Sequence, residues 1–114
     1  LLGATQVVLK PRAWSSQRHW HEGEDEFLIM LSGEAVLIED EGETILRAGD
    51  CAAWAAGVRN GHHLVNRSGA DCAFICLSAG DRDAGGGYSD IDMIFTAAGY
   101  QHRDGTPYDT ERLP

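Results

Sequence analysis

The chain has 114 residues, a length that suits one domain with a hydrophobic core of its own. Its formal net charge is −9, from 9 Lys and Arg against 18 Asp and Glu, and an acidic surface repels phosphate backbones. We therefore expect no nucleic-acid partner, and because no run of about eighteen apolar residues occurs, we expect no membrane span.

Short runs of β-branched and aliphatic residues recur along the chain between turn signals, and no window shows sustained helical periodicity. Asp40-Glu41-Gly42 and Asn66-Arg67-Ser68-Gly69 are typical hairpin turns between such runs. Many short antiparallel strands are typical of a β-sandwich or barrel, so we predict an all-β fold. The expected strands cover residues 5–10, 17–21, 26–31, 34–39, 43–47, 51–54, 62–66, 70–78 and 91–95.

The last third of the chain reads as an addition to this core. Gly85-Gly86-Gly87 suggests a phosphate loop, but such a loop needs a helix after it and none is expected here. We interpret the segment as a flexible linker to a last β-segment. In the tail, Asp104-Gly105-Thr106-Pro107 predicts a turn, and we expect the tail to pack outside the barrel or to fray. We thus expect one domain over 1–114, with a core over about 5–78 and a loop and C-terminal β-extension over 79–114.

Three histidines and one glutamate have the spacing of ligands to a single metal ion. His19 and His21 lie two residues apart on an expected strand, so they point to the same face. Glu26 rejoins that face only if the residues after His21 form a bend or bulge, which Gly23 makes plausible. A later strand supplies His62. Three imidazoles and a carboxylate suit Zn, Fe, Ni, Mn or Cu, with room left for water or substrate.

The stretch from His19 to Gly33 resembles the first motif of the cupin family, which is His-x-His, three or four residues, Glu, six residues and Gly. The second cupin motif is matched by Gly49, Gly57, His62 and Asn66. Ala13 and Ala55 replace a glycine and a proline of the two motifs. Two extra residues precede His62, so His63 stays open as the fourth ligand, although the strand face relative to Asn66 favours His62.

Residues 57–68 and the tail segment 104–108 are similar to those of small bacterial cupins often labelled sugar-phosphate-isomerase-like. The resemblance implies a metal-binding double-stranded β-helix, also called a jelly-roll barrel, and a homodimer. A homodimer also suits a chain whose edge strands would otherwise stay exposed.

The expected chemistry is that of one divalent transition metal, Zn, Mn, Fe or Ni, acting on a small-molecule ligand or substrate. A metal-dependent isomerase, epimerase or lyase acting on a small polar or carboxylated substrate, such as a sugar derivative, is our first hypothesis, with Glu26 as a possible base. A non-catalytic metal or ligand binding module, including a sensor, is the second. If the metal is iron, the reaction becomes oxygenation by a dioxygenase.

Other residues near the motifs receive structural interpretations. Asn66 is expected to form hydrogen bonds at a strand end, and Gln17 is a candidate acceptor for an imidazole N–H. A solvated acidic loop is expected for Glu22, Glu24 and Asp25. Core or dimer-face positions are expected for Trp14, Trp20 and Trp54, with Trp20 pointing away from the histidines. Positions lining an apolar pocket around the ion are expected for Leu28, Met30 and Leu64. Positions packed on the second sheet or a partner subunit are expected for Phe27, Ile29 and Leu31.

The cysteines form an odd set, Cys51, Cys72 and Cys76, without CxxC spacing. We interpret them as buried, reduced thiols of a cytoplasmic protein. A thiolate ligand or a redox role is the alternative.

Overall fold

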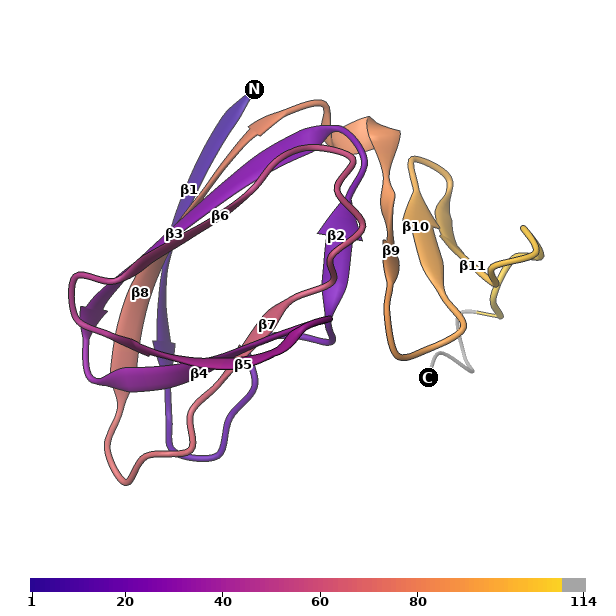
Figure 1. Cartoon of the computed structure of the whole chain (residues 1–114). Helices are drawn as coiled ribbons and strands as arrows, with labels where there is room; N and C mark the ends of the chain where they lie inside the picture. Colours follow the sequence, from indigo (N-terminus) through magenta and orange to yellow (C-terminus); the bar gives the residue numbers. More distant parts are fainter. Residues whose placement is uncertain (110–114) are drawn as a thin grey trace.

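The structure of the protein, a computed structural model, describes residues 1–109. This part of the chain is built of short strands and a single-turn 3₁₀ helix, which confirms the all-β prediction (Figure 1). The elements are β1 (Leu2–Leu9), β2 (His19–His21), β3 (Glu24–Ser32), β4 (Glu34–Glu39), β5 (Gly42–Arg47), β6 (Cys51–Trp54), β7 (His63–Val65), β8 (Cys72–Gly80), η1 (Arg82–Ala84), β9 (Gly86–Tyr88), β10 (Ile94–Thr96) and β11 (Gly99–Gln101). No helix among these residues is long and apolar enough to cross a membrane.

Two sheets face each other to form a barrel (Figure 1). One has the strand order β1-β8-β3-β6 and the other has the order β5-β4-β7. Between them lies a core of buried apolar side chains, which explains why the strands show alternating apolar residues. The core consists of Leu9, Leu28, Met30, Ala35, Leu37, Leu46, Trp54, Leu64, Cys72 and Phe74.

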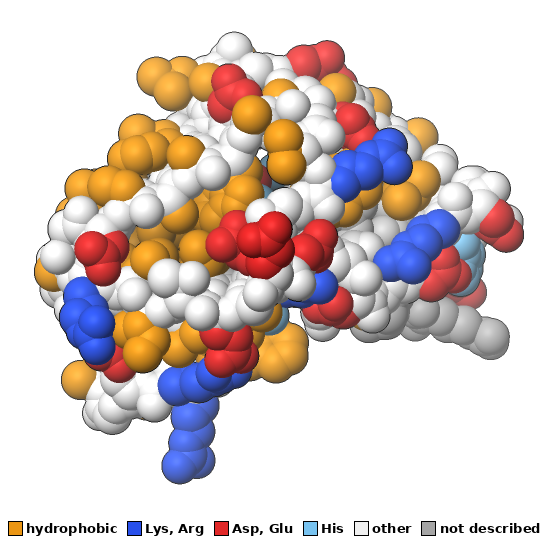
Figure 2. Space-filling model, in the orientation of Figure 1, with side chains coloured by type: hydrophobic (Ala, Val, Ile, Leu, Met, Phe, Trp, Pro, Cys, Tyr) orange, Lys and Arg blue, Asp and Glu red, His pale blue; other side chains and the backbone are white. Residues whose placement is uncertain are grey.

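Strand β3 illustrates the two faces of the barrel wall. Leu28 and Met30 are 3% and 1% exposed, as predicted for the inner face. On the outer face, Phe27 and Leu31 are 38% and 44% exposed. The expectation that this face packs on the second sheet is wrong, because the second sheet covers only the inner face. Figure 2 shows hydrophobic side chains at the surface of the barrel half of the molecule.

The three cysteines are free thiols with different environments. Cys72 is buried in the core, as expected, and Cys76 is half-buried beside it. Cys51 is exposed, so the expectation of a buried thiol is wrong there. Cys51 begins the edge strand β6, whose side chains point alternately inward and to solvent.

A third sheet extends from β2, with the strand order β2-β9-β10-β11, and projects away from the barrel (Figure 1). The interpretation of the triple glycine as a flexible linker is wrong, because Gly86 and Gly87 lie within β9 and pair with β2. A Cβ on Gly87 would lie 2.5 Å from the Trp20 ring. The absence of side chains therefore lets β9 approach β2 closely.

The tail continues this sheet as β11 and then turns back on it. The predicted turn is confirmed: the Thr106 N–H donates to Asp104 Oδ1 at 2.8 Å, and Gly105 has a φ of 92°. Pro107 then forms a bridge with Gln101, so the tail packs on the extension as far as the structure describes it. Residues 110–114 of the expected tail lie outside the described residues.

Candidate functional site

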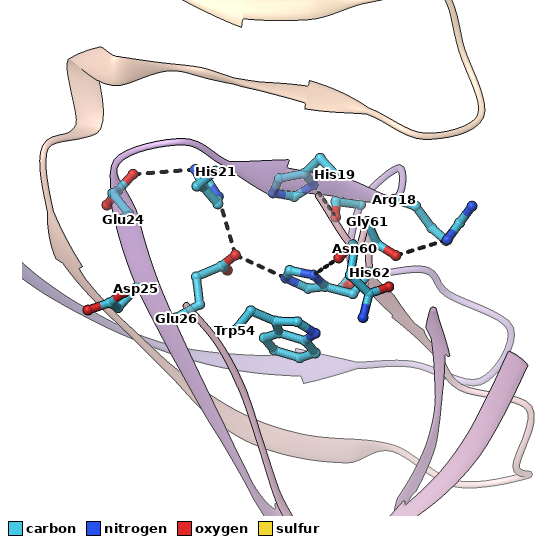
Figure 3. Close-up of polar contacts among 12 residues, drawn as sticks. Arg18, His19, His21, Glu24, Asp25, Glu26, Trp54, Asn60, Gly61 and His62 are labelled. Carbon is cyan, nitrogen blue, oxygen red and sulfur yellow. Dashed lines mark hydrogen bonds and ion pairs between the residues drawn. The ribbon is translucent and has the colours of Figure 1, made fainter. Parts of the chain in front are cut away.

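The structure brings the predicted cluster together at one end of the barrel (Figure 3). β2 supplies His19 and His21, β3 supplies Glu26, and the residue preceding β7 is His62. His19 and His62 form an antiparallel bridge, so two segments distant in sequence lie side by side. Glu26 Oε1 lies 3.0 Å from His62 Nε2 and 3.6 Å from His21 Nε2. The centroid of the His19 ring is 5.1 Å from that of His21 and 6.1 Å from that of His62.

A bend at residues 22–23 lets Glu26 rejoin the face of His19 and His21, as the spacing predicted. The bend sits tightly on η1, because a Cβ on Gly23 would lie 2.5 Å from the Ala84 Cβ. On its other side, the His21 carbonyl accepts a hydrogen bond from the Gly57 N–H at 2.9 Å. The turn between the two ligand strands is therefore fixed by contacts with segments far along the chain.

Two imidazoles are oriented by backbone carbonyls two residues before them. His19 Nδ1 donates to the Gln17 carbonyl at 2.8 Å, and His62 Nδ1 donates to the Asn60 carbonyl at 2.9 Å. A carbonyl oxygen only accepts, so Nδ1 carries the hydrogen in both rings and Nε2 is the nitrogen left for the site. Gln17 does provide the expected acceptor for an imidazole, through its backbone rather than its side chain.

The third imidazole is oriented by a carboxylate. His21 Nδ1 lies 3.4 Å from Glu24 Oε1. Glu24 is 9% exposed and begins β3, so the expectation that it lies in a solvated loop is wrong. Its position on the face of Glu26, two residues away, explains the burial. Asp25 points the other way and accepts a hydrogen bond from the Ala56 N–H at 2.7 Å.

Sequence reasoning missed the support beneath His62. The Trp54 ring stacks on the His62 ring, with 3.6 Å between centroids and 3° between planes. Trp54 Nε1–H donates to Glu39 Oε2 at 2.9 Å, and Asn60 Nδ2 donates to the same oxygen at 2.8 Å. Trp54 is the cross-strand partner of Glu26, so the pairing of β3 with β6 is the signal that would have placed it in the site.

Burial and neighbouring charges shift the pKa values of two members of the cluster. Burial alone would raise the pKa of Glu26, but the hydrogen bond from His62 and the nearby imidazoles outweigh it and hold that pKa below its usual value. Burial lowers the pKa of His19. The hydrogen bond to the Gln17 carbonyl raises this pKa and the charge of His21 lowers it further, and the net result is a lowered pKa. A carboxylate and a neutral imidazole are the forms that bind metal ions.

A cavity lies on each side of His19. The inner cavity, of about 280 Å³, is mostly apolar and reaches Glu26 and His62. Leu28 and Leu64 line it, as predicted, whereas the prediction for Met30 is wrong, because that side chain lies within the barrel core. Cys76 also lines it, and burial raises the pKa of this thiol to about 11, which keeps it protonated. The outer cavity, of about 310 Å³, lies between the histidines of β2 and the C-terminal extension. Its lining is His19, His21, Tyr88, Phe95, Thr96, Gly99 and Tyr100.

The neighbouring polar residues have structural partners elsewhere. His63 Nδ1 donates to the Ser16 carbonyl at 2.7 Å, and its ring packs on Trp14, away from Glu26. Asn66 is fully buried, and its side-chain amide donates to the Leu9 carbonyl at 2.9 Å, as a hydrogen-bonding residue at a strand end should. Of the two candidate histidines, His62 is therefore the one beside the carboxylate.

The cluster does not have a ready ligand geometry. Within residues 1–109, no group of three or more His, Cys, Asp or Glu side chains is placed so that it could hold a metal ion. Glu26 instead contacts His62 directly. The donor set nevertheless fits a transition metal, because three imidazoles and one carboxylate from three segments lie close together in one cluster.

Comparison with known proteins places this geometry in a family. Residues 5–78 match the Cupin domain family. Over its whole length the chain is similar to a sugar phosphate isomerase from a cupin superfamily of Silicibacter pomeroyi, with 38% identity and a TM-score of 0.89. That similarity covers 99% of this chain and 74% of the other.

More distant structures share the fold alone. A protein of Acidithiobacillus ferrooxidans, whose name also proposes a sugar phosphate isomerase, has 16% identity and a TM-score of 0.77, covering 98% of this chain and 72% of the other. A predicted oxalate decarboxylase of Thermotoga maritima has 24% identity and a TM-score of 0.61, covering 68% of this chain and 65% of the other. None of the curated proteins matches the chain.

Proposed function

Because this chain belongs to the cupin family, we propose that its histidine–glutamate cluster binds one divalent transition metal and that the protein is a metal-dependent enzyme of the isomerase, epimerase or lyase type. The substrate we propose is a small polar or carboxylated molecule, such as a sugar derivative. The 38% identity to a protein named as a sugar phosphate isomerase supports the class of reaction. Zn, Mn, Fe and Ni all suit this donor set.

One observation carries the proposal: the imidazoles turn their Nδ1 atoms to fixed acceptors outside the cluster. Two of these acceptors are hydrogen-bonded backbone carbonyls, and the third is the Glu24 carboxylate, 3.4 Å from His21 Nδ1, so the protein itself orients the rings. Such outer contacts fix the tautomer and the orientation of metal-binding histidines. The remaining nitrogens and the Glu26 carboxylate form the donor set.

The residues around the cluster have different roles in the proposed reaction. When bound, the ion would supply Lewis acidity that polarises a carbonyl group of the substrate. The Glu26 carboxylate, whose Oε1 lies 3.0 Å from His62 Nε2, is placed to take a proton from a molecule bound at the cluster. The apolar walls contributed by Leu28 and Leu64 keep water away from the inner cavity.

Elemental analysis of freshly purified protein tests the metal site. We expect one metal ion per chain in the wild type and a background level in His21→Ala. The matched control is His102→Ala, because His102 lies in the tail and pairs with Asp92 at 2.8 Å, away from the cluster. Full metal content in His21→Ala, or an equal loss in both variants, would show that the ion binds elsewhere.

Deuterium exchange tests the reaction class separately. Metal-loaded protein is incubated in D₂O with aldoses and hydroxy acids, and NMR detects deuterium at the carbon beside the carbonyl group. Exchange that disappears in Glu26→Gln, while metal content is retained, supports an isomerase-type reaction. Metal binding without exchange would favour a binding or sensor module, and oxygen consumption by the iron-loaded protein would favour a dioxygenase.

A further inference from the structure

The C-terminal extension continues the face on which the histidines lie. Residues paired across antiparallel strands share one face of a sheet. His19 pairs with Tyr88 across β2 and β9. His21 pairs with Gly86, which pairs in turn with Phe95 on β10. Phe95 pairs with Tyr100 on β11, so three aromatic side chains extend the histidine face away from the barrel.

The aromatic rings contact the histidines directly. The centroid of the Phe95 ring is 5.4 Å from that of His21 and 6.1 Å from that of His19, with interplanar angles of 70° and 77°. The centroid of the Tyr88 ring lies 5.6 Å from that of His19 and 5.7 Å from that of Phe95. Gly86 makes this possible, because a Cβ there would lie 2.5 Å from the end of the Phe95 ring. The rings form the wall of the outer cavity of about 310 Å³.

This wall carries no permanent positive charge. Among the described residues, no lysine or arginine lines the outer cavity or the inner one. Proteins bind phosphate groups with arginine, lysine or the N-termini of helices, and neither cavity offers any of these. What the outer cavity offers is aromatic ring surface beside two imidazoles and the hydroxyl-bearing Thr96 and Tyr100.

The nearby arginines lie on the other face of the same sheet. Arg18, Arg59 and Arg103 line an adjoining cavity together with Trp20 and Ile94, whose side chains point opposite to His19 and Phe95. This cavity shares Tyr88, Phe95 and Thr96 with the outer cavity. Each of these arginines already forms an ion pair or a hydrogen bond within the protein. Arg18 pairs with Asp40 and Asp90, Arg59 with Glu22, and Arg103 with the carbonyls of Tyr88 and Ser89. Figure 2 shows basic and acidic side chains adjacent on the face near the extension.

We propose that the aromatic wall made by Tyr88, Phe95 and Tyr100 binds the flat face of an uncharged, ring-shaped substrate and directs its oxygen substituents to the imidazoles. The ligand is a ring without a phosphate group, either an aromatic ring or a sugar ring, since both present an apolar face to aromatic side chains. The inference rests on the proposed function only in that the imidazoles are taken to hold a metal ion. The wall itself is a property of the extension.

NMR titration of metal-free protein tests the wall directly. The probes are phenol, methyl β-glucopyranoside, glucose 6-phosphate and inorganic phosphate. We expect phenol or the glucoside to shift the ring resonances of Phe95 and Tyr100, which identifies the source of the ring. Glucose 6-phosphate should bind no more tightly than the glucoside, and inorganic phosphate should leave these resonances unchanged.

Two variants of β10 separate ring binding from folding. Phe95→Leu keeps an apolar side chain but removes the ring, and should weaken binding about three- to tenfold, the usual contribution of one aromatic contact. Ile94→Ala changes the opposite face of the same strand and should bind like the wild type. Both variants should keep the dispersed spectrum of the wild type.

Three results would overturn the inference: no shift with either ring compound, tighter binding of the phosphorylated sugar, or unchanged affinity in Phe95→Leu. Metal content measured on the same samples keeps this test distinct from that of the proposed function. Ring binding that persists in metal-free His21→Ala supports the wall whatever the outcome for the metal. Metal binding that persists in Phe95→Leu supports the cluster whatever the outcome for the ring.

Discussion

Replacing Trp54 with alanine should weaken both the fold and the metal site that we propose. The Trp54 side chain is 8% exposed, and its ring lies parallel to that of His62 at 3.6 Å. Truncating a buried tryptophan costs about 3–5 kcal/mol, because apolar contacts are lost and a cavity remains. His62 also loses the surface that orients it, and loss of a supporting contact typically lowers metal affinity by about 10- to 100-fold.

Trp54→Phe separates the stacking from the hydrogen bond. A phenyl ring still lies against His62 but cannot donate to Glu39, which accepts from the indole at 2.9 Å. Losing a hydrogen bond to a charged group costs about 1.5–3 kcal/mol. We expect the lower end of this range, because Asn60 still donates to the same oxygen at 2.8 Å.

Urea denaturation of the metal-free protein, followed by circular dichroism, measures the stability change, and calorimetric titration with Zn²⁺ measures the affinity. Trp14→Phe is the matched control, because Trp14 is 57% exposed. An exposed substitution should change the free energy of unfolding by less than about 0.5 kcal/mol. If Trp54→Ala were no less stable than this control, or bound Zn²⁺ as tightly as the wild type, the role assigned to Trp54 would be refuted.

Three further predictions concern the extension, an ion pair and the outer barrel face. Gly86→Ala should speed up hydrogen exchange in β9 and β10, because the added Cβ would lie 2.5 Å from the Phe95 ring of β10. The control is Gly69→Ala, whose Cβ would meet no atom within 4 Å. Equal exchange rates in the two variants would contradict the reasoning. The hydrogen bond from Arg18 holds the pKa of Asp90 below its usual 3.8, so its contribution to stability is present above pH 3.8 and lost as the pH falls through the lower, folded-state pKa. The stability difference between wild type and Asp90→Asn should therefore shrink from pH 6 to pH 3, and a constant difference would disprove the assignment. We expect a homodimer that buries the exposed outer face of β3. Phe27→Glu should convert this dimer to a monomer, as measured by light scattering. A monomeric wild type at micromolar concentration would refute the prediction.

The sequence was sufficient for the barrel and for the shared face of His19, His21 and Glu26, because these depend on local signals. Alternating apolar residues mark the inner face of β3, and the two-residue spacing of His19 and His21 places both rings on one side. Gly23 marks the bend that returns Glu26 to that side. These features lie within a few residues of one another, so they can be recognised without knowledge of strand pairing.

The rest depends on contacts between distant segments. β9 consists of two glycines and one tyrosine, so only one of its three residues favours a strand. It is a strand because its backbone fits closely against Trp20 of β2 and Phe95 of β10. The role of Trp54 likewise follows from its pairing with Glu26 on another strand. No local pattern identifies either partner.

The extension also bears on the cluster itself, because β2 is only three residues long. A strand this short cannot hold two imidazoles in place alone. On one side it pairs with β9, and on the other it bonds to the segment of His62. The family match ends at residue 78, before β9, whereas the protein from Silicibacter pomeroyi matches 99% of this chain. The barrel is therefore what the chain shares with the wider family. The strands that pair onto β2 and line the outer cavity lie beyond the family match, and the similarity to the protein from Silicibacter pomeroyi extends over them. We expect substrate choice among proteins with this extension to be decided there rather than at the ligands.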